Sequence, residues 1–102
     1  MVIQKIVTLS PKSRGFHLVT RELLAEVPEM ASIELGMAHF FIQHTSASLT
    51  INESADPDVR GDMERYFAHS VPENAPYFRH VLEGPDDMPA HIKAAIIGSA
   101  LT

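Results

Sequence analysis

The stretch DPDVRGDMERYFAHS, residues 56–70, together with the two runs before it, decides which elements this chain forms. Asp56 followed by Pro57 predicts a helix start, because a short polar side chain caps the first turn and proline fits its first position. Residues 33–43 and 46–52 are rich in residues that favour β structure, which predicts two adjacent strands before this helix. Within the helix, one face carries Val59, Met63, Tyr66, Phe67 and Ser70.

The N-terminal flank continues the pattern of short elements. Residues 2–9 are rich in β-branched side chains and predict a strand, and residues 15–19 predict a second short extended piece. Thr20 is expected to cap a short helix that ends near Pro28. Two prolines and an asparagine punctuate residues 71–78, which indicates a loop after the long helix.

The C-terminal flank predicts one more helix and the beginning of a strand. Residues 88–97 are expected to be helical, with Gly98 just past the helix end. Residues 99–102 look like the first residues of a strand, which indicates a shortened version of a longer protein. The sequence holds no repeat, low-complexity tract or linker, so we expect residues 1–102 to be a single domain.

Composition narrows the class of protein. At 102 residues the chain can bury only a modest core, so oligomerisation would help it. It has no cysteine, which excludes disulfides, thiolate nucleophiles and Cys-ligated metal sites. A net charge of −5, with eight scattered Lys and Arg, argues against nucleic acid as a partner. The sequence shows neither an apolar signal region nor a bilayer span, so we expect a cytoplasmic protein with no membrane partner.

Histidines, carboxylates and hydroxyls, the side chains typical of binding and catalytic sites, are concentrated in two segments. These are HTSASLTINE at residues 44–53 and HVLEGPDDMPAHIK at residues 80–93. We call these the first and second polar segments, and we expect them to meet around a ligand. Their histidines, His44, His80 and His91, follow no local metal-binding spacing, and each alone could be an ordinary histidine satisfied by the backbone. Their settings favour a role in metal binding or catalysis. His91, for example, lies in a first helical turn, whose positive dipole end disfavours the charged imidazolium and leaves the neutral ring free to bind a metal or act as a base.

The carboxylates of these segments allow two interpretations. Asp86 and Asp87 could hold Mg²⁺ beside a diphosphate, or they could simply cap a helix and complement its dipole. Glu53, beside Asn52, could act as a general base or orient a histidine, or it could be a solvated strand end.

Hydroxyl and cationic residues suggest a phosphorylated ligand. Thr45, Ser46 and Ser48 could hydrogen-bond a phosphate, and Arg14 supplies charge for the same purpose. No Walker loop or G-x-S-x-G motif is present, so nucleotide hydrolysis and serine-esterase chemistry have no support. These residues are therefore candidates for binding a phosphate group.

Four strings taken together, SRGFHLVT, QHTSASLTINE, DPDVRGDMERYF and EGPDDMPAHIK, closely resemble the YjbQ family, a group of small proteins described as secondary thiamine-phosphate synthases. The resemblance covers essentially the whole chain. It implies an α+β fold, with antiparallel β-sheets in a sandwich-like arrangement and two to three helices packed outside. It also implies a homotrimer with the polar site near subunit boundaries. Family members usually continue with further strands, including a segment that contains glycine and tryptophan, which this chain lacks.

The resemblance assigns roles to the polar segments. It implies that His44, His80 and His91 are metal or substrate ligands, and that the residues around them line the same pocket. A divalent metal, zinc or magnesium, is the implied cofactor. The candidate catalytic residues are Glu53, His44 and Asp87, and the candidate substrate-binding residues are Arg14, Thr45, Ser46, Ser48, Asn52, Asp86 and Lys93.

The implied reaction joins a hydroxymethylpyrimidine diphosphate to a thiazole phosphate and releases diphosphate. Such a displacement needs a divalent ion and cationic or amide donors on the leaving group, because stabilising its charge dominates the chemistry. Two alternatives remain open. One is a His-ligated metal enzyme, such as a hydrolase, with another substrate. The other is a trimeric protein that binds a metal or a small ligand without catalysis.

Overall fold

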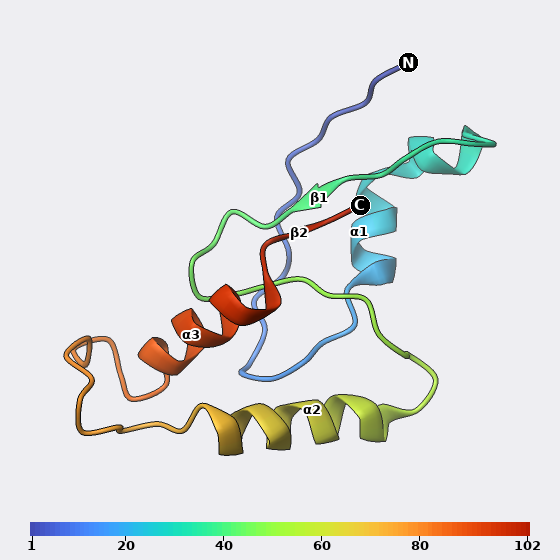
Figure 1. Cartoon of the computed structure of the whole chain (residues 1–102). Helices are drawn as coiled ribbons and strands as arrows, with labels where there is room; N and C mark the ends of the chain where they lie inside the picture. Colours follow the sequence, from blue (N-terminus) through green and yellow to red (C-terminus); the bar gives the residue numbers. More distant parts are fainter. The chain divides into compact units, whose positions relative to one another are not determined.

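A computed structural model describes residues 1–102. It contains helices and two very short strands, which loops connect (Figure 1). The order is α1 (Thr20–Glu26), the 3-10 helix η1 (Pro28–Ser32), β1 (Phe40–Phe41), α2 (Pro57–Ser70), α3 (Asp87–Ile97) and β2 (Ala100–Leu101). The chain divides into two compact units, Met1–Gly36 and Met37–Thr102. We call them the first and the second unit.

The first unit is built around α1 and η1. The expected helix is confirmed, but Thr20 is its first residue and Val19 takes the cap position without a side-chain hydrogen bond. Pro28 separates the two helices, since proline lacks the amide hydrogen that an α-helix interior requires and suits a first turn.

The predicted strand over residues 2–9 is wrong, because these residues form no regular element. Residues 15–19 likewise lie outside any strand. A β-branched composition favours extended backbone only where a neighbouring strand accepts its hydrogen bonds, and none pairs with these residues.

The sheet of the second unit joins segments that are far apart in sequence. β1 and β2 are antiparallel, with Phe40 opposite Leu101 and Phe41 opposite Ala100. Backbone hydrogen bonds extend this contact, from the Ile42 amide to the Ser99 carbonyl at 2.9 Å. The prediction that residues 99–102 begin a strand is therefore confirmed.

The expected pair of strands over residues 33–43 and 46–52 is wrong in length and partner. Only Phe40 and Phe41 of these residues are in a strand, and that strand pairs with β2. The structure is α+β, with three α-helices and one two-stranded antiparallel sheet. The sandwich of sheets stays a prediction.

Helix α2 begins as its sequence predicts. Asp56 is the N-cap, its carboxylate accepts a hydrogen bond from the Asp58 amide at 2.8 Å, and Pro57 follows at the first helical position. The helix runs to Ser70, with the exposed His69 in its last turn. The local signals at this helix start were therefore sufficient.

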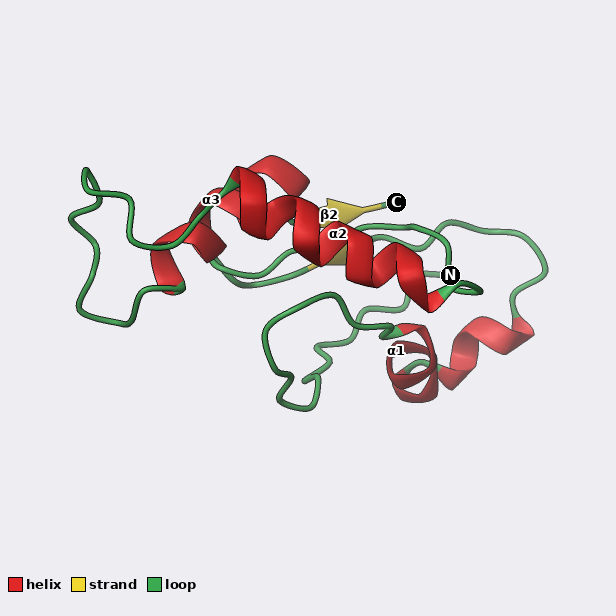
Figure 2. Ribbon diagram, turned by 90° about the horizontal axis from the view of Figure 1, so that it is seen from below, coloured by secondary structure: helices red, strands yellow, loops and turns green.

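Helix α3 also follows its sequence signals. Asp86 takes the cap position without a side-chain hydrogen bond, and Gly98 follows the last turn with a φ of 100°. A side chain at Gly98 would be strained, because L-residues rarely adopt this backbone conformation. The loop between α2 and α3 is long, as Figure 2 shows, and it carries the chain to His80.

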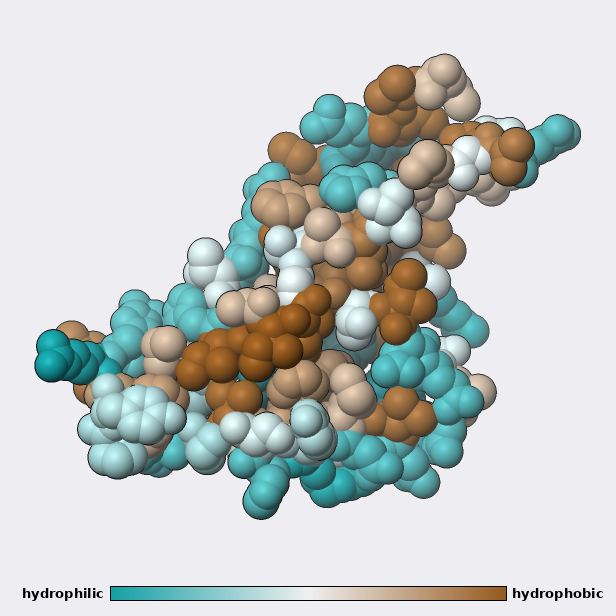
Figure 3. Space-filling view, viewed as in Figure 1, coloured by the Kyte–Doolittle hydropathy of each residue, from teal (hydrophilic) through white to brown (hydrophobic).

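Few side chains of this protein are buried. Phe67 and Val71, each 8% exposed, are the buried hydrophobic residues, and Pro89 is buried in the first turn of α3. Many apolar residues remain at the surface, and Figure 3 shows a group of them over α3, where Ile96 is 62% exposed. None of the helices combines the length and apolar character that crossing a bilayer requires.

Candidate functional site

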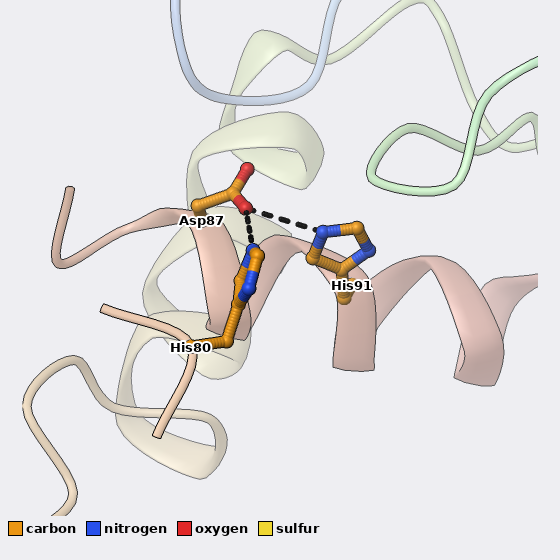
Figure 4. Close-up of side chains that lie close together, drawn as sticks. All are labelled: His80, Asp87 and His91. Carbon is orange, nitrogen blue, oxygen red and sulfur yellow. Dashed lines mark hydrogen bonds and ion pairs between the residues drawn. The ribbon is translucent and has the colours of Figure 1, made fainter. Parts of the chain in front are cut away.

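Three titratable side chains of the second polar segment converge at the start of α3 (Figure 4). Asp87 is the first residue of this helix and His91 lies one turn later, and residues four apart project from the same helix face. His80 comes from the loop that leads into the helix. One ligand atom from each residue lies within 4.8 Å of the others. We call this cluster the His-Asp-His triad.

One carboxylate oxygen is the centre of the triad. Oδ2 of Asp87 lies 2.7 Å from Nε2 of His80 and 3.2 Å from Nε2 of His91. The two imidazole rings are 5.3 Å apart at an angle of 78°. Both histidines therefore direct the same kind of nitrogen toward a single oxygen.

The first polar segment reaches the triad through its backbone. Nδ1 of His91 lies 2.9 Å from the carbonyl oxygen of Thr45. A carbonyl oxygen only accepts, so Nδ1 carries the hydrogen and donates it. The neutral form of His91 then presents the lone pair of Nε2 to the Asp87 carboxylate, an arrangement that is stable only with a proton or a metal cation between them. The two segments therefore meet at this contact, while a ligand between them stays a prediction.

The protonation of Asp87 follows from its neighbours. The hydrogen bond from His80 lowers the pKa of the Asp87 carboxyl below its ordinary value, and the charge of His91 acts in the same direction, while partial burial opposes them. The Glu83 carboxylate is a further neighbour, 3.8 Å from Nε2 of His80. Asp87 therefore stays an acceptor for any cation at neutral pH.

Exposure decides from which side the triad can be reached. The side chain of Asp87 is 21% exposed and that of His91 is 30% exposed, whereas that of His80 is 45% exposed. Solvent and solutes therefore have access on the side of His80. The deeper groups are held from two directions, by the helix and by the Thr45 carbonyl.

The donor set of the triad fits a divalent transition-metal ion. Two imidazole nitrogens and one carboxylate form a common three-ligand set for zinc and iron, which leaves further coordination positions open. The His91–Thr45 hydrogen bond is also of the kind that orients a metal-binding histidine through its second nitrogen. Magnesium prefers oxygen ligands, so it matches this set less well.

His44 is not a member of the triad. Its Nδ1 accepts a hydrogen bond from the Ser46 amide at 3.0 Å and lies 3.2 Å from the Ser46 hydroxyl. His44 lines an open depression of about 450 Å³ instead, together with Phe41, Ile42, Gln43, Thr45 and Ser99. Of the three predicted histidine ligands, the structure therefore brings two together, and the third member of the cluster is the carboxylate of Asp87.

The other candidates of the first polar segment lie apart from the triad. Asn52 uses its side-chain oxygen to accept from the Glu53 amide at 2.8 Å, and Glu53 is exposed. Ser46 and Ser48 are half-buried. Thr45 is the residue of this group with a direct contact to the triad, and the contact comes from its backbone.

The remaining candidates occupy three different places. Asp86 is exposed at the cap position of α3. Lys93 follows Asp87 by six residues, roughly 240° around the helix, and so lies on another face of α3. Arg14 belongs to the first unit. None of the three is among the residues that converge at the triad.

Sequence reasoning missed the joint role of Asp87 and His91. Their spacing of four residues is the helical spacing that places two ligands on one face, and it was tested only between histidines. Glu83 and the Thr45 carbonyl were also missed. No sequence signal marks a single backbone carbonyl, since every residue has one.

The comparisons with known proteins agree on one family. The family described as "UPF0047 protein YjbQ-like" matches residues 5–102, so the chain belongs to this family. The UPF0047 protein YjbQ of Escherichia coli O157:H7 is 54% identical over 101 residues, which cover 99% of this chain and 72% of that protein. The UPF0047 protein YugU of Bacillus subtilis is 40% identical over 82 residues, covering 80% of this chain and 59% of that protein.

Solved structures support the same assignment. The chain is similar to the conserved hypothetical protein TT1486 of Thermus thermophilus, with a TM-score of 0.71 and 36% identity. That match covers 85% of this chain and 64% of the Thermus chain. An uncharacterized YjbQ/UPF0047 protein of Clostridium acetobutylicum gives a TM-score of 0.67 and 37% identity. The resemblance noted in the sequence is therefore confirmed at the level of the family, whose function these names leave open.

Proposed function

We propose that this chain binds a divalent metal ion at His80, Asp87 and His91 and uses it on a small phosphorylated substrate. The observation that carries the proposal is the convergence of Nε2 of both histidines on Oδ2 of Asp87. The hydrogen bond from His91 to the Thr45 carbonyl supports it, because it leaves Nε2 of His91 free to bind a cation.

The specific reaction that we propose is the joining of hydroxymethylpyrimidine diphosphate to a thiazole phosphate with release of diphosphate. A bound divalent ion would supply positive charge against the negative charge that develops on the leaving diphosphate. The ionised Asp87 helps to retain that ion, and the hydroxyls of Thr45, Ser46 and Ser48 are the proposed donors to a phosphate group. Their segment adjoins the triad at the Thr45 carbonyl.

The assembly is part of the same proposal. Few side chains of this chain are buried, and large apolar side chains such as Leu35, 94% exposed, and Leu82, 99% exposed, remain at the surface. Burial of such surface favours association. We therefore retain the homotrimer and the sandwich-like completion of the sheet as proposals, which light scattering and an experimental structure test.

Metal binding is the first test. Calorimetric titration of the chain with zinc should give one tight site, and Asp87→Asn should weaken it by more than about 100-fold, because even groups that only orient a ligand contribute roughly 10- to 100-fold. Asp86→Asn is the matched control, since it removes an adjacent exposed carboxylate. Equal affinities for the wild type and Asp87→Asn, or no binding at all, would overturn the proposed site.

A third variant addresses the first polar segment. His44→Ala should keep zinc affinity within about threefold of the wild type, because His44 lies outside the triad. A loss as large as that of Asp87→Asn would instead mean that His44 joins the metal on binding, as the sequence alone suggested.

Catalysis needs its own test. The purified chain, supplied with zinc or magnesium and both thiamine precursors, should form thiamine phosphate, which chromatography detects. If no product forms with either metal, the synthase reaction is excluded for this chain.

A second candidate function, a His-ligated metal hydrolase, is favoured by one observation. Two of the three triad donors are imidazole nitrogens, which suit zinc better than magnesium. Release of inorganic phosphate from phosphate esters by the zinc-loaded chain, abolished in Asp87→Asn, would support this candidate. Tight zinc binding with no turnover of either kind would leave a metal-binding protein.

A further inference from the structure

A small pocket opens beside the triad, on the exposed side of His80. Its volume is about 240 Å³, and it lies between the loop that follows α2 and the first turn of α3. His80 belongs to both the pocket and the triad, and Met88 of the pocket directly follows Asp87 in α3. The pocket is lined by Asn74, Phe78, His80, Val81, Pro85 and Met88, with Ala75 and Gly84.

The lining is mostly apolar and includes an aromatic ring. Phe78 is held in place from two sides, since its amide donates to the Ala75 carbonyl at 3.0 Å and its ring stands edge-on to Tyr77 at 5.2 Å. Val81, Pro85 and Met88 offer no hydrogen-bonding side-chain group apart from the weak thioether acceptor. Such a surface favours a ligand group with little charge.

Two residues give the pocket wall its shape and its one amide group. Asn74 has a φ of 60°, a left-handed conformation that asparagine adopts more readily than most residues. Its side chain adds a donor and an acceptor to the lining. Gly84 has a φ of 107°, and a Cβ there would lie 3.1 Å from Oδ1 of Asp86, so this turn requires glycine.

The size of the pocket indicates what it can hold. A closed apolar cavity of about 150 Å³ is enough to bind benzene. A pocket of about 240 Å³ therefore accommodates a six-membered ring with small substituents. A ring placed there would have its substituents within reach of His80, the pocket residue that is shared with the triad.

We infer that this pocket is the subsite for a flat, weakly charged ring of the substrate, whose phosphate group is directed toward the His-Asp-His triad. The inference rests on the proposed function for the phosphate, and it adds the place where the ring of the substrate binds and the residues that hold it. Phe78, Val81 and Met88 contact the ring faces and edges, and the Asn74 amide bonds a polar atom on the ring.

The test compares two phosphate esters that differ in their ring. Phenyl phosphate and methyl phosphate are titrated separately into the zinc-loaded chain by calorimetry. Phenyl phosphate should bind roughly tenfold more tightly than methyl phosphate, because the pocket removes the ring from water. Equal affinities of the two esters for the wild-type chain would overturn the inference.

Two tryptophan variants locate the preference. Val81→Trp should fill the pocket and abolish the preference for phenyl phosphate, while methyl phosphate and zinc bind as before. Ile96→Trp is the matched control, since Ile96 is 62% exposed on α3 outside the pocket and Val81 is 57% exposed. The control should keep the tenfold preference. A preference that persists in Val81→Trp would place the ring elsewhere and overturn the inference.

A further pocket variant and a neutral probe separate this inference from metal binding. Met88→Ala, which removes a pocket wall without filling it, should weaken phenyl phosphate selectively if Val81→Trp fails to fold. Benzyl alcohol, which has no phosphate, should shift the NMR resonances of Phe78, Val81 and Met88 even when no metal binds. If these resonances shift but zinc does not bind to the chain, the pocket is supported and the proposed metal site is contradicted. If benzyl alcohol shifts none of these resonances, the pocket is overturned.

Discussion

The first unit carries ion pairs at its surface and has no buried side chain, whereas the second unit contains the buried side chains and the triad. In the first unit, Lys5 pairs with Glu29 at 2.7 Å and Lys12 with Glu22 at 2.7 Å, and neither α1 nor η1 has a buried residue. In the second unit, Phe67 and Val71 are buried. Because exposed ion pairs contribute little to stability, the second unit should dominate the free energy of unfolding.

The largest expected effect on stability tests this contrast directly. Phe67→Ala should lower the free energy of unfolding by about 3 kcal/mol, because it leaves a cavity in a small core. Leu24→Ala in the first unit, where Leu24 is 44% exposed, should cost well under half as much. Urea denaturation followed by circular dichroism measures both, and similar losses would contradict the contrast.

The next prediction compares the zinc affinity of two variants, each of which removes a histidine from one of the units. His80→Ala should weaken zinc binding by more than about 100-fold, since it removes one triad donor and even groups that only orient a ligand contribute roughly 10- to 100-fold. His17→Ala, in the first unit, should leave zinc affinity unchanged, because Nε2 of His17 bonds the Ser13 carbonyl at 2.6 Å. Competition with a chromogenic chelator gives both affinities, and a large loss in His17→Ala would contradict the assignment of the site to the second unit.

A smaller effect lies at the start of α2. Asp56→Ala should lower stability by about 1 kcal/mol, because it removes the side chain that caps the Asp58 amide. Asp56→Ser, which keeps a capping oxygen, should restore most of the loss. Thermal unfolding provides the measurement, and equal melting temperatures of the alanine and serine variants would exclude the capping role.

The smallest expected effect concerns the pH dependence of the stability of the first unit. The hydrogen bonds from Lys12 and the Ser10 amide lower the pKa of Glu22 from its ordinary value of 4.5. Stabilisation by these contacts is therefore complete above pH 4.5 and is lost as the pH falls through the lowered pKa. The protection factors of the α1 amides, which are hydrogen-exchange rates corrected for the intrinsic pH dependence of exchange, should fall below that pH in the wild type. The loss of protection should be weaker in Glu22→Gln, and a pH profile identical to that of the wild type would exclude Glu22 as its source.

The sequence predicted those parts of the fold whose signals are local. Asp56 and Pro57 mark the start of α2, and Gly98 marks the end of α3, because caps and prolines act within one turn. The strands are predicted too long, since residues 2–9 and 46–52 have β-favouring side chains but belong to no strand of the sheet. Pairing depends on distant segments, which composition does not specify.

The same distinction applies to the candidate site. His80, Asp87 and His91 were all singled out by residue type, and the helical spacing of the last two accounts for their common face. The position of His44 could not be predicted, because its segment is not part of a regular element. The contact of the Thr45 carbonyl could not be predicted for a further reason. It depends on the position of a backbone atom, which the identity of the side chain at residue 45 does not determine.

The pairing of β1 with β2 also has a kinetic consequence. It closes a chain loop whose ends are far apart in sequence, as the contact of His39 with Thr102 across 63 residues indicates. Closing such a loop costs entropy before any contact repays it, so this sheet should form late in folding, after the local turns of α2 and α3. The same closure brings the Leu49 amide, four residues after Thr45, to the carbonyl of Gly98, seven residues after His91. Competence to bind metal should therefore return in the slow phase of refolding, after helical circular dichroism has recovered.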